Sequence, residues 1–173
     1  MPTLFMVQLG GRPKGRLIEQ HDMFFGVANQ VSELIEDINH HWPEVKNKWH
    51  IDSYRAITKI GNHSIKLVES ATSYDNNGLK LFFINLGGYQ QGSFEEFYKE
   101  FTFKDKDSPF DAASHIDDKF AVDIDDIYNV NDLISNVQIL IEPIAYDSHA
   151  LANTDDDKEY VGYLSIKNLR KLT

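Results

Sequence analysis

The sequence predicts an α+β protein made of two tandem ββαββ repeats, with largely antiparallel sheets packed into one compact body and a C-terminal strand. Two observations lead to this prediction. The chain opens in the same way twice, with LFMVQLGG at residues 4–11 and LFFINLGG at residues 81–88. In addition, only residues 10–17 separate the first two expected strands, and a parallel crossover needs a dozen residues or more. This strand pair should therefore be antiparallel.

The two repeats correspond at a nearly constant offset. Seven residues of the first repeat recur 77 positions later, as the same residue type: Leu4, Phe5, Leu9, Gly10, Gly11, Gly15 and Glu19. Further on the offset is 73, where the stretch 50–54 corresponds to 123–127. A fixed offset of this kind is typical of an internal duplication. We divide the chain into a first repeat (1–72), a second repeat (78–145) and a polar loop with a C-terminal strand and tail (146–173).

The elements of the first repeat follow from its apolar pattern. The run LFMV is apolar at each position, so both faces of this strand should be covered. A second strand is expected over about 19–27. A helix should follow, with Asn29 as its cap and Pro43 at its end. Its apolar stripe comprises Val27, Val31, Leu34, Ile35, Ile38 and Trp42. Two further strands should be joined by a turn at Gly61-Asn62.

The second repeat is expected to follow the same order. LFFI begins it, and a strand is expected over 96–103. The stretch Ser108-Pro109 is typical of a helix start. Two strands should follow, with Ser135-Asn136 near the position of the first repeat's turn. After the polar stretch 145–160, alternation predicts one more strand over 160–166 and a basic tail after it.

Composition limits the function. The chain carries 17 Lys and Arg residues against 27 Asp and Glu residues, a formal net charge of −10. This charge argues against a nucleic-acid partner and against an anionic membrane surface. No cysteine is present, which excludes disulfides, thiolate metal ligands and thiol catalysis. The N-terminus has neither the basic leader of a signal peptide nor a membrane span, so we expect a cytoplasmic protein.

Three separated blocks resemble one known family. LFMVQLGG, then Glu19, His21 and Asp22, then the stretch HIDSY at 50–54 are similar to domain-of-unknown-function family 1543. That family is a set of small bacterial proteins with one or two copies of the domain, and LFFINLGGY resembles the start of its second copy. The resemblance covers about residues 3–70 and 80–143. It implies a soluble, duplicated bacterial protein and no activity. The second copy departs from the pattern, because EFYK stands at 96–99 in place of EQHD.

Two histidines and two carboxylates are candidate metal ligands. Residues i and i+2 of a strand point to one face, so Glu19 lies beside His21 and His50 beside Asp52. If these strands were neighbours, the four side chains would converge into a set that suits zinc, manganese or iron. The favoured interpretation is a structural hydrogen bond between histidine and carboxylate. A third interpretation is acid–base catalysis without metal by His21 or His50, with Asp22, on the opposite strand face, as a lesser candidate.

The first glycine-rich loop is a candidate anion site. Gly10, Gly11, Arg12 and Gly15 could present backbone N–H groups and positive charge to an anion. The loop is neither a Walker loop nor a dinucleotide fingerprint, and a strand rather than a helix should follow it. The second copy lacks the basic residues. A turn that needs positive φ accounts for both loops and is the favoured interpretation.

Two classes of function are therefore considered. The leading hypothesis is a non-enzymatic structural or protein-binding module, because the shared residues are mostly Leu, Phe and Gly, and duplicated units offer surfaces for a protein partner or a homodimer. The alternative is a small metal-dependent or acid–base enzyme that uses the His and carboxylate cluster of the first repeat. No cofactor is predicted apart from this candidate divalent metal.

Overall fold

The computed structural model describes residues 1–70, 78–89, 97–98, 102–104, 121–144 and 159–172. The chain divides into two units. The first consists of Met1–Leu67 with Pro143–Thr173, and the second of Val68–Glu142. The α+β class with antiparallel sheets is confirmed. The C-terminal segment, which the sequence analysis placed apart, belongs to the first unit.

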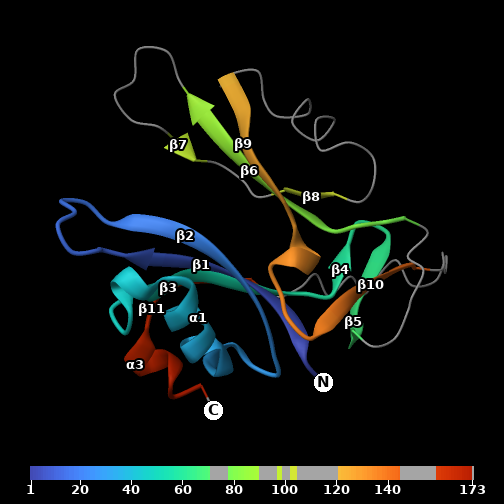
Figure 1. Ribbon diagram of the computed structural model, residues 1–173, viewed down its shortest axis with the longest axis horizontal. Coiled ribbons are helices and arrows are strands. Elements are labelled where there is room, and N and C mark those ends of the chain that lie inside the picture. The colour runs from blue at the N-terminus through green and yellow to red at the C-terminus, as the bar shows by residue number, and fades with distance from the viewer. Residues whose placement is uncertain (71–77, 90–96, 99–101, 105–120, 145–158, 173) are drawn as a thin grey trace. The chain divides into compact units, whose positions relative to one another are not determined.

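The first unit is built on a four-stranded antiparallel sheet (Figure 1). Its strands, in spatial order, are β11 (Glu159–Ser165), β3 (His50–Ile57), β1 (Thr3–Gly11) and β2 (Gln20–Ala28). Each pairs antiparallel with its neighbour. The predicted antiparallel pairing of the first two strands is thus confirmed. The second and third strands, considered above as possible neighbours, are not adjacent, because β1 lies between β2 and β3.

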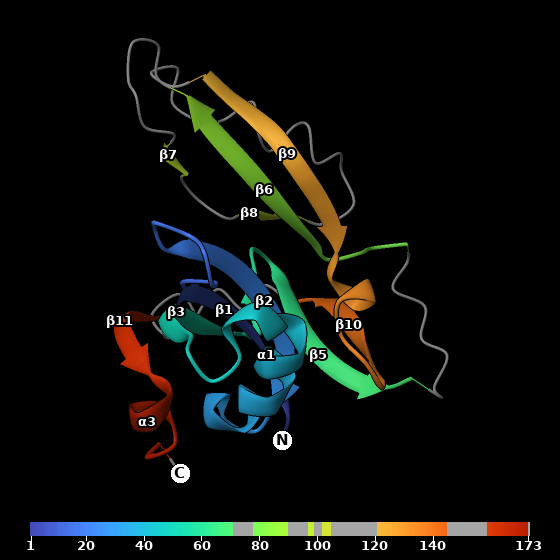
Figure 2. The ribbon, with the colours of Figure 1, turned by 60° about the vertical axis from the view of Figure 1, so that its left-hand side comes forward.

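Short helices cover one face of this sheet (Figure 2). They are η1 (Val31–Leu34), α1 (Ile35–His41), η2 (Pro43–Val45) and α3 (Ile166–Leu169). Val27, which was expected in the apolar stripe of the helix, belongs to β2, because this strand continues to Ala28. Asn29 is not the N-cap of the helical segment. The N-cap of η1 is Gln30, whose side chain makes no capping hydrogen bond. Instead, the Glu33 carboxylate accepts a hydrogen bond from the Asn29 backbone N–H at 2.9 Å.

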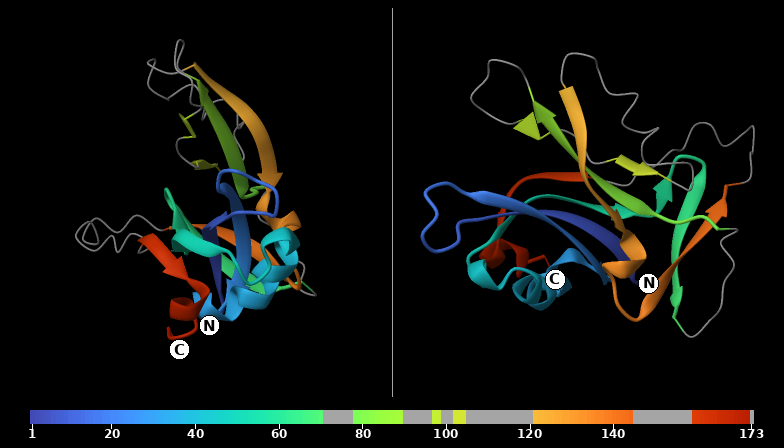
Figure 3. Two further views of the ribbon diagram at one scale, coloured as in Figure 1. Left: turned by 90° about the vertical axis from the view of Figure 1, so that its left-hand side faces the viewer. Right: turned by 45° about the horizontal axis from the view of Figure 1, so that its top comes forward.

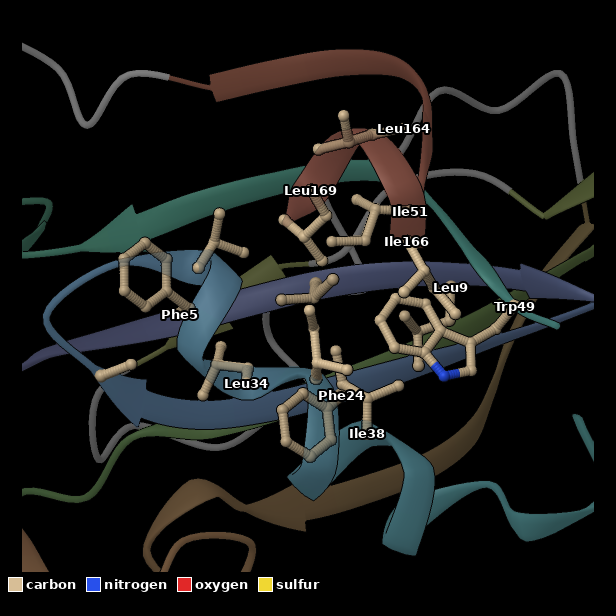
Figure 4. Close-up of a cluster of buried hydrophobic side chains, with 14 of the residues drawn as sticks. Phe5, Leu9, Phe24, Leu34, Ile38, Trp49, Ile51, Leu164, Ile166 and Leu169 are labelled. Atoms are coloured by element: carbon tan, nitrogen blue, oxygen red, sulfur yellow. The ribbon is translucent and has the colours of Figure 1, made fainter. Parts of the chain in front are cut away.

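The core of the first unit lies between the sheet and these helices. Figure 4 shows Leu34 and Ile38 gathered with Leu9, Ile51 and Leu169 in one cluster. The expected stripe is confirmed at its centre, where Val31, Leu34, Ile35 and Ile38 are all buried. Both faces of β1 are also covered as predicted, because Leu4, Phe5, Met6 and Val7 are all buried.

The predicted turn at Gly61-Asn62 joins a small hairpin. Its strands are β4 (Lys59–Ile60) and β5 (His63–Glu69), which pair antiparallel. Gly61 has φ +54°, a left-handed conformation that glycine adopts without steric cost.

The second unit centres on one long strand. β6 (Phe82–Tyr89) pairs antiparallel with β7 (Phe97–Tyr98), β8 (Thr102–Lys104) and β9 (Ala121–Asn129). Both views in Figure 3 show β6 and β9 side by side. A short helix, η3 (Val130–Asp132), and β10 (Val137–Pro143) follow, with Asn136 at φ +66° between them. The helix expected from Ser108 lies outside the described residues.

Matching β-bulges occur in the two units. Between β1 and β3, the register passes from Gln8↔Ser53 to Leu9↔Ile51 and leaves Asp52 unpaired. Between β6 and β9 it passes from Asn85↔Asp126 to Leu86↔Ile124 and leaves Asp125 unpaired. The equivalent positions are separated by 77 residues on the first strand and by 73 on the second, as in the sequence alignment. Common descent of the two units stays a prediction.

Candidate metal centre

The two candidate histidines flank a glycine at one end of the first sheet. Gly10 of β1 pairs with His21 of β2 on one side and with His50 of β3 on the other. The preceding residue, Leu9, and its partner Ile51 belong to the core beneath the helices. Because side chains alternate along a strand, Gly10 and both histidines lie on the opposite face. The sheet thus brings the histidines together across β1 rather than on adjacent strands.

Gly10 leaves room for the site because it has no side chain. A Cβ atom at this position would lie against His50 Nε2 and 2.9 Å from Asp52 Oδ2, closer than real Cβ contacts come. Gly10 and Gly11 are strand residues, and only Gly15 of this segment has positive φ. The turn interpretation of the first two glycines is therefore wrong. The close approach of His50 and Asp52 is what requires Gly10.

A bulge places Asp52 in the site. Asp52 is the unpaired residue where β3 meets β1. The register between β3 and β11 shifts at the same place, from Val161↔Ser53 to Leu164↔Ile51, so Asp52 has no partner on β11 either. Bulges of this kind re-aim side chains and are frequent beside active sites. Asp52 Oδ1 lies 3.1 Å from His50 Nε2, and Asp52 Oδ2 is buried without a hydrogen-bond partner.

All four predicted side chains converge. Glu19, immediately before β2, places Oε1 at 3.4 Å from His50 Nε2 and 3.5 Å from His21 Nε2. Asp52 Oδ2 lies 3.4 Å from His21 Nε2. Glu19, His50 and Asp52 each offer a ligand atom, and these three atoms lie within 4.8 Å of one another. His21, whose side chain is 53% exposed, contacts two of the three from the solvent side.

Asp22 lies on the other face of β2 and does not join the cluster. Its Oδ2 lies 2.9 Å from His41 Nε2, at the end of α1. Burial by itself raises the pKa of the Asp22 carboxyl, but the hydrogen bonds with His41 and with the Met23 N–H, and the charge of His41, outweigh it and lower the pKa. This is an ordinary hydrogen-bonded pair. Its nitrogen–oxygen distance is a reference for the corresponding distances in the cluster of Glu19, His21, His50 and Asp52.

A buried amide holds the turn that leads into His50. Asn39 of α1 is buried, and its Oδ1 accepts hydrogen bonds from the Asn47 N–H and from Trp49 Nε1, both at 2.9 Å. Its Nδ2 donates to Asn47 Oδ1 at 3.1 Å. The sequence analysis missed this role. The available signal was a polar residue four positions after Ile35, on the apolar face of the predicted helix.

Tyr163 of β11 covers one side of His50. The two ring centroids are 4.3 Å apart, with an interplanar angle of 33°. His50 is buried, whereas Tyr163 is largely exposed. The imidazole of His50 thus contacts the Tyr163 ring, and its Nε2 closely approaches Gly10. No sequence pattern indicated this contact, because it depends on how β11 pairs with β3.

The second unit has the same register without the histidines. Gly87, at the position of Gly10, pairs with Tyr98 on one side and with Asp123 on the other. These two residues take the places of His21 and His50. The set of two imidazoles is therefore a property of the first unit.

The four residues of the candidate anion loop lie in two different parts of the fold. Gly10 and Gly11 belong to β1, whereas Arg12 and Gly15 lie in the connection between β1 and β2. Arg12 and Gly15 line an open hollow with the neighbouring residues Pro13, Lys14, Arg16 and Leu17, and with Glu44 and Lys48 from the segment that follows α1.

The comparisons with known proteins identify the first unit's central segment. Residues 16–67 match the family model described as Domain of Unknown Function (DUF1543). This segment is similar to the DUF1543 family. The resemblance inferred from the sequence is thus confirmed for it, and Glu19, His21, His50 and Asp52 all lie within the DUF1543 segment. The family description names no activity.

Several solved chains match the chain that carries the DUF1543 segment, and one of them shares its fold over nearly the whole length. It is described as "Crystal structure of a protein Il1583 from Idiomarina loihiensis", with a TM-score of 0.67 and 24% sequence identity. The match covers 96% of this chain and 98% of that one. No curated protein matches the chain. Within the described residues, no helix has the length and apolar character needed to cross a membrane.

Proposed function

We propose that the first unit binds one divalent transition-metal ion through Glu19, His50 and Asp52, with His21 completing the site. The spacing of the side chains carries this proposal. A charge-assisted hydrogen bond is about 2.7–2.9 Å long, as in the Asp22–His41 pair at 2.9 Å. The four nitrogen–oxygen separations of the cluster are 3.1, 3.4, 3.4 and 3.5 Å. Two ligands about 2.1 Å from one tetrahedral ion lie roughly 3.3–3.4 Å apart.

The unpartnered oxygen of Asp52 also supports a cation. Asp52 Oδ2 is buried and accepts no hydrogen bond within the described part of the chain. A buried carboxylate oxygen without a partner is costly. A bound cation at the centre of the cluster would compensate the negative charge of Asp52. It would also reduce the repulsion between the Glu19 and Asp52 carboxylates.

The donor set restricts the metal. Imidazole and carboxylate ligands together suit zinc, manganese and iron, whereas calcium and magnesium prefer oxygen ligands alone. Glu19 and His21 are exposed, so solvent reaches the site from their side. A metal ion that binds water on this side would make that water a nucleophile for hydrolysis, which is the chemistry of the small metal-dependent enzyme considered above.

Metal analysis of the full-length protein tests the proposal. The protein is stripped with a chelator, equilibrated with zinc, manganese or cobalt, and assayed by elemental analysis and titration calorimetry. We expect one ion per chain. Affinity should fall with decreasing pH, because protons compete for the imidazole nitrogens. The His50→Gln and Asp52→Asn variants should each bind metal at least about tenfold more weakly. Even the loss of a residue that only orients a metal ligand lowers metal affinity by about that factor.

The Asp22–His41 pair provides the matched control. The double variant Asp22→Asn, His41→Gln removes one carboxylate and one imidazole from the other face of the sheet, and it should keep the full affinity for metal. Equal weakening in this variant and in His50→Gln would contradict a specific site, as would a wild-type protein that binds no stoichiometric metal.

The edge strand β11 favours a second candidate function, a homodimer interface. Within the described residues, β11 is paired only with β3, so its other edge carries free backbone groups. Val161 and Tyr163 on this strand are largely exposed. A second copy of the chain could pair along this edge. Light scattering of wild type and of the Val161→Glu variant tests the idea. A wild-type dimer that the variant converts to a monomer supports it, and a monomeric wild type contradicts it.

A further inference from the structure

A positively charged hollow lies in the first unit and shares no residue with the candidate metal cluster. It has a volume of about 500 Å³ and is bounded by the β1–β2 connection and by the segment after α1. Four cations line it, namely Arg12, Lys14, Arg16 and Lys48, against the single carboxylate Glu44. The chain as a whole has a net charge of −10. The hollow therefore departs sharply from the charge of the rest of the molecule.

None of the four cations forms an ion pair within the described part of the chain. The ion pairs that hold the cluster and its neighbourhood join His21, His41 and His50 to Glu19, Asp22 and Asp52, and none of them includes these four cations. Four unpaired cations that share one hollow repel one another, and this repulsion is relieved when an anion binds among them. The planar guanidinium of arginine can also donate hydrogen bonds to two oxygens of one phosphate group at once, and lysine adds a compact positive charge.

Backbone contacts hold both walls of the hollow. In the first wall, the Arg16 N–H donates to the Pro13 carbonyl at 3.1 Å, and Gly15, at φ +86°, closes this turn. In the second wall, the Lys48 N–H donates to the Val45 carbonyl at 2.7 Å.

Gly11 lies at the point where the two walls pack against each other. A Cβ atom on Gly11 would lie 3.2 Å from both methyl groups of the buried Val45, so the end of β1 packs directly against the second wall. The side chains of the hollow thus extend from a fixed backbone frame, although they are themselves exposed.

We propose that this hollow binds the phosphate group of a small phosphorylated molecule. The number of cations favours a dianion over a single carboxylate. The net negative charge of the chain disfavours extended polyanions such as nucleic acid. Leu17, 94% exposed at the rim, offers an apolar contact to the remainder of such a molecule.

Phosphate titrations of the full-length protein test this proposal. The protein is treated with a chelator so that phosphate cannot bind through a metal ion. Inorganic phosphate is titrated at low ionic strength and followed by backbone amide chemical shifts. We expect saturable shifts at Arg12, at residues 14–17 and at Lys48. The triple variant Arg12→Gln, Lys14→Gln, Arg16→Gln should bind at least about tenfold more weakly, because each lost cation removes a charge-assisted contact.

A second triple variant controls for overall charge. Lys167→Gln, Arg170→Gln, Lys171→Gln removes three exposed cations from the C-terminal end and makes the same change in net charge. This variant should keep the wild-type affinity. Equal weakening in both variants, or shifts that do not saturate, would overturn the proposal.

A vesicle experiment separates a soluble ligand from a lipid headgroup. Leu17 and Ile18 are both exposed at this connection, which also suits contact with a bilayer. Vesicles of phosphatidylcholine with phosphatidic acid are sedimented with wild type and with the Leu17→Ser, Ile18→Ser variant. Binding of free phosphate without sedimentation supports the proposal. Sedimentation that the variant abolishes, in a protein that does not bind free phosphate, would overturn it.

Discussion

At the scale of single residues, Gly10 decides whether the four side chains of the cluster can meet. Its pairing with both His21 and His50 places it between the two strands that carry them. Any side chain at this position would occupy the space of His50 Nε2 and Asp52 Oδ2. Its neighbour Gly11 points to the other face of β1 and contacts Val45 there. Two adjacent glycines thus have separate roles.

The substitution Gly10→Ala should weaken metal binding strongly and stability moderately. The added methyl group displaces the His50 ring, so we expect at least tenfold weaker binding, and an overpacking cost of about 1–3 kcal/mol in the free energy of unfolding. Calorimetric titration and urea denaturation measure the two effects. In the matched variant Gly11→Ala, the methyl group meets Val45 at 3.2 Å, so stability should fall while metal affinity is retained. Equal metal affinity in the two variants would contradict this role of Gly10.

The Asp22–His41 pair predicts a dependence of stability on pH. The pKa of Asp22 is lowered from its ordinary value of 3.8, so the folded protein binds this proton less readily than the unfolded chain does. The resulting stabilisation is complete well above pH 3.8 and is lost as the pH falls through the folded-state pKa. Asp22→Asn should therefore lower the free energy of unfolding at pH 7, by at most about 1 kcal/mol because the pair is half exposed.

As the pH falls through the folded-state pKa of Asp22, the difference between Asp22→Asn and wild type should become smaller, since the wild-type carboxyl then takes up its proton. Urea unfolding at a series of pH values from 7 downward measures this difference. A difference that stays the same across the series would show that the charge of Asp22 does not stabilise the fold.

At the scale of elements, two irregularities bring the site together. The bulge in β3 turns Asp52 toward the histidines, and the turn after α1 delivers His50 to the start of the same strand. Asn47 in that turn has φ +58°, a left-handed conformation that asparagine tolerates better than most residues. Its hydrogen bonds with the buried Asn39 hold this conformation.

The substitution Asn39→Ala should affect both stability and the site. It leaves Trp49 Nε1 and the Asn47 N–H without an acceptor, which should cost about 1–3 kcal/mol. Metal affinity should fall as well, because Trp49 directly precedes His50. Urea unfolding and metal titration provide the two readouts. Asn29→Ala, at an exposed position, should change neither. If Asn39→Ala lost stability but kept full affinity, the turn would not position His50.

At the scale of the whole molecule, the first unit is discontinuous in sequence. Its sheet takes its edge strand β11 from the end of the chain, and Leu164, Ile166 and Leu169 enter the core beside residues from the first 51 positions (Figure 4). The first 72 residues therefore do not contain a complete core. Closing the fold requires the C-terminal segment, which also supplies Tyr163 to the site.

The substitution Leu169→Ala should destabilise the first unit by about 2–5 kcal/mol, because it leaves a cavity at a fully buried position. Leu172→Ala is the matched control, since Leu172 is 45% exposed and three residues away. It should cost far less. Thermal or urea unfolding compares them. Similar losses for the two variants would show that α3 is not part of the folded core.

Much of the first unit follows from the sequence alone, because its signals are local. The unbroken apolar run in β1 predicts a strand covered on both faces, and the short connection to β2 predicts antiparallel pairing. The spacing of Ile35 and Ile38 predicts the buried face of α1. Strand alternation places Glu19 with His21 and His50 with Asp52, and these i, i+2 pairs do meet. Each inference depends on backbone geometry over a few residues.

Tertiary structure alone decided the rest, because those features depend on contacts between distant segments. No local pattern indicates that β1 lies between β2 and β3. From the sequence alone, Gly10 therefore cannot be distinguished from a turn glycine. The bulge at Asp52 arises from registers with two partner strands. The addition of β11, and with it the contact of Tyr163 with His50, joins residues more than 100 positions apart, a separation over which no local pattern carries information.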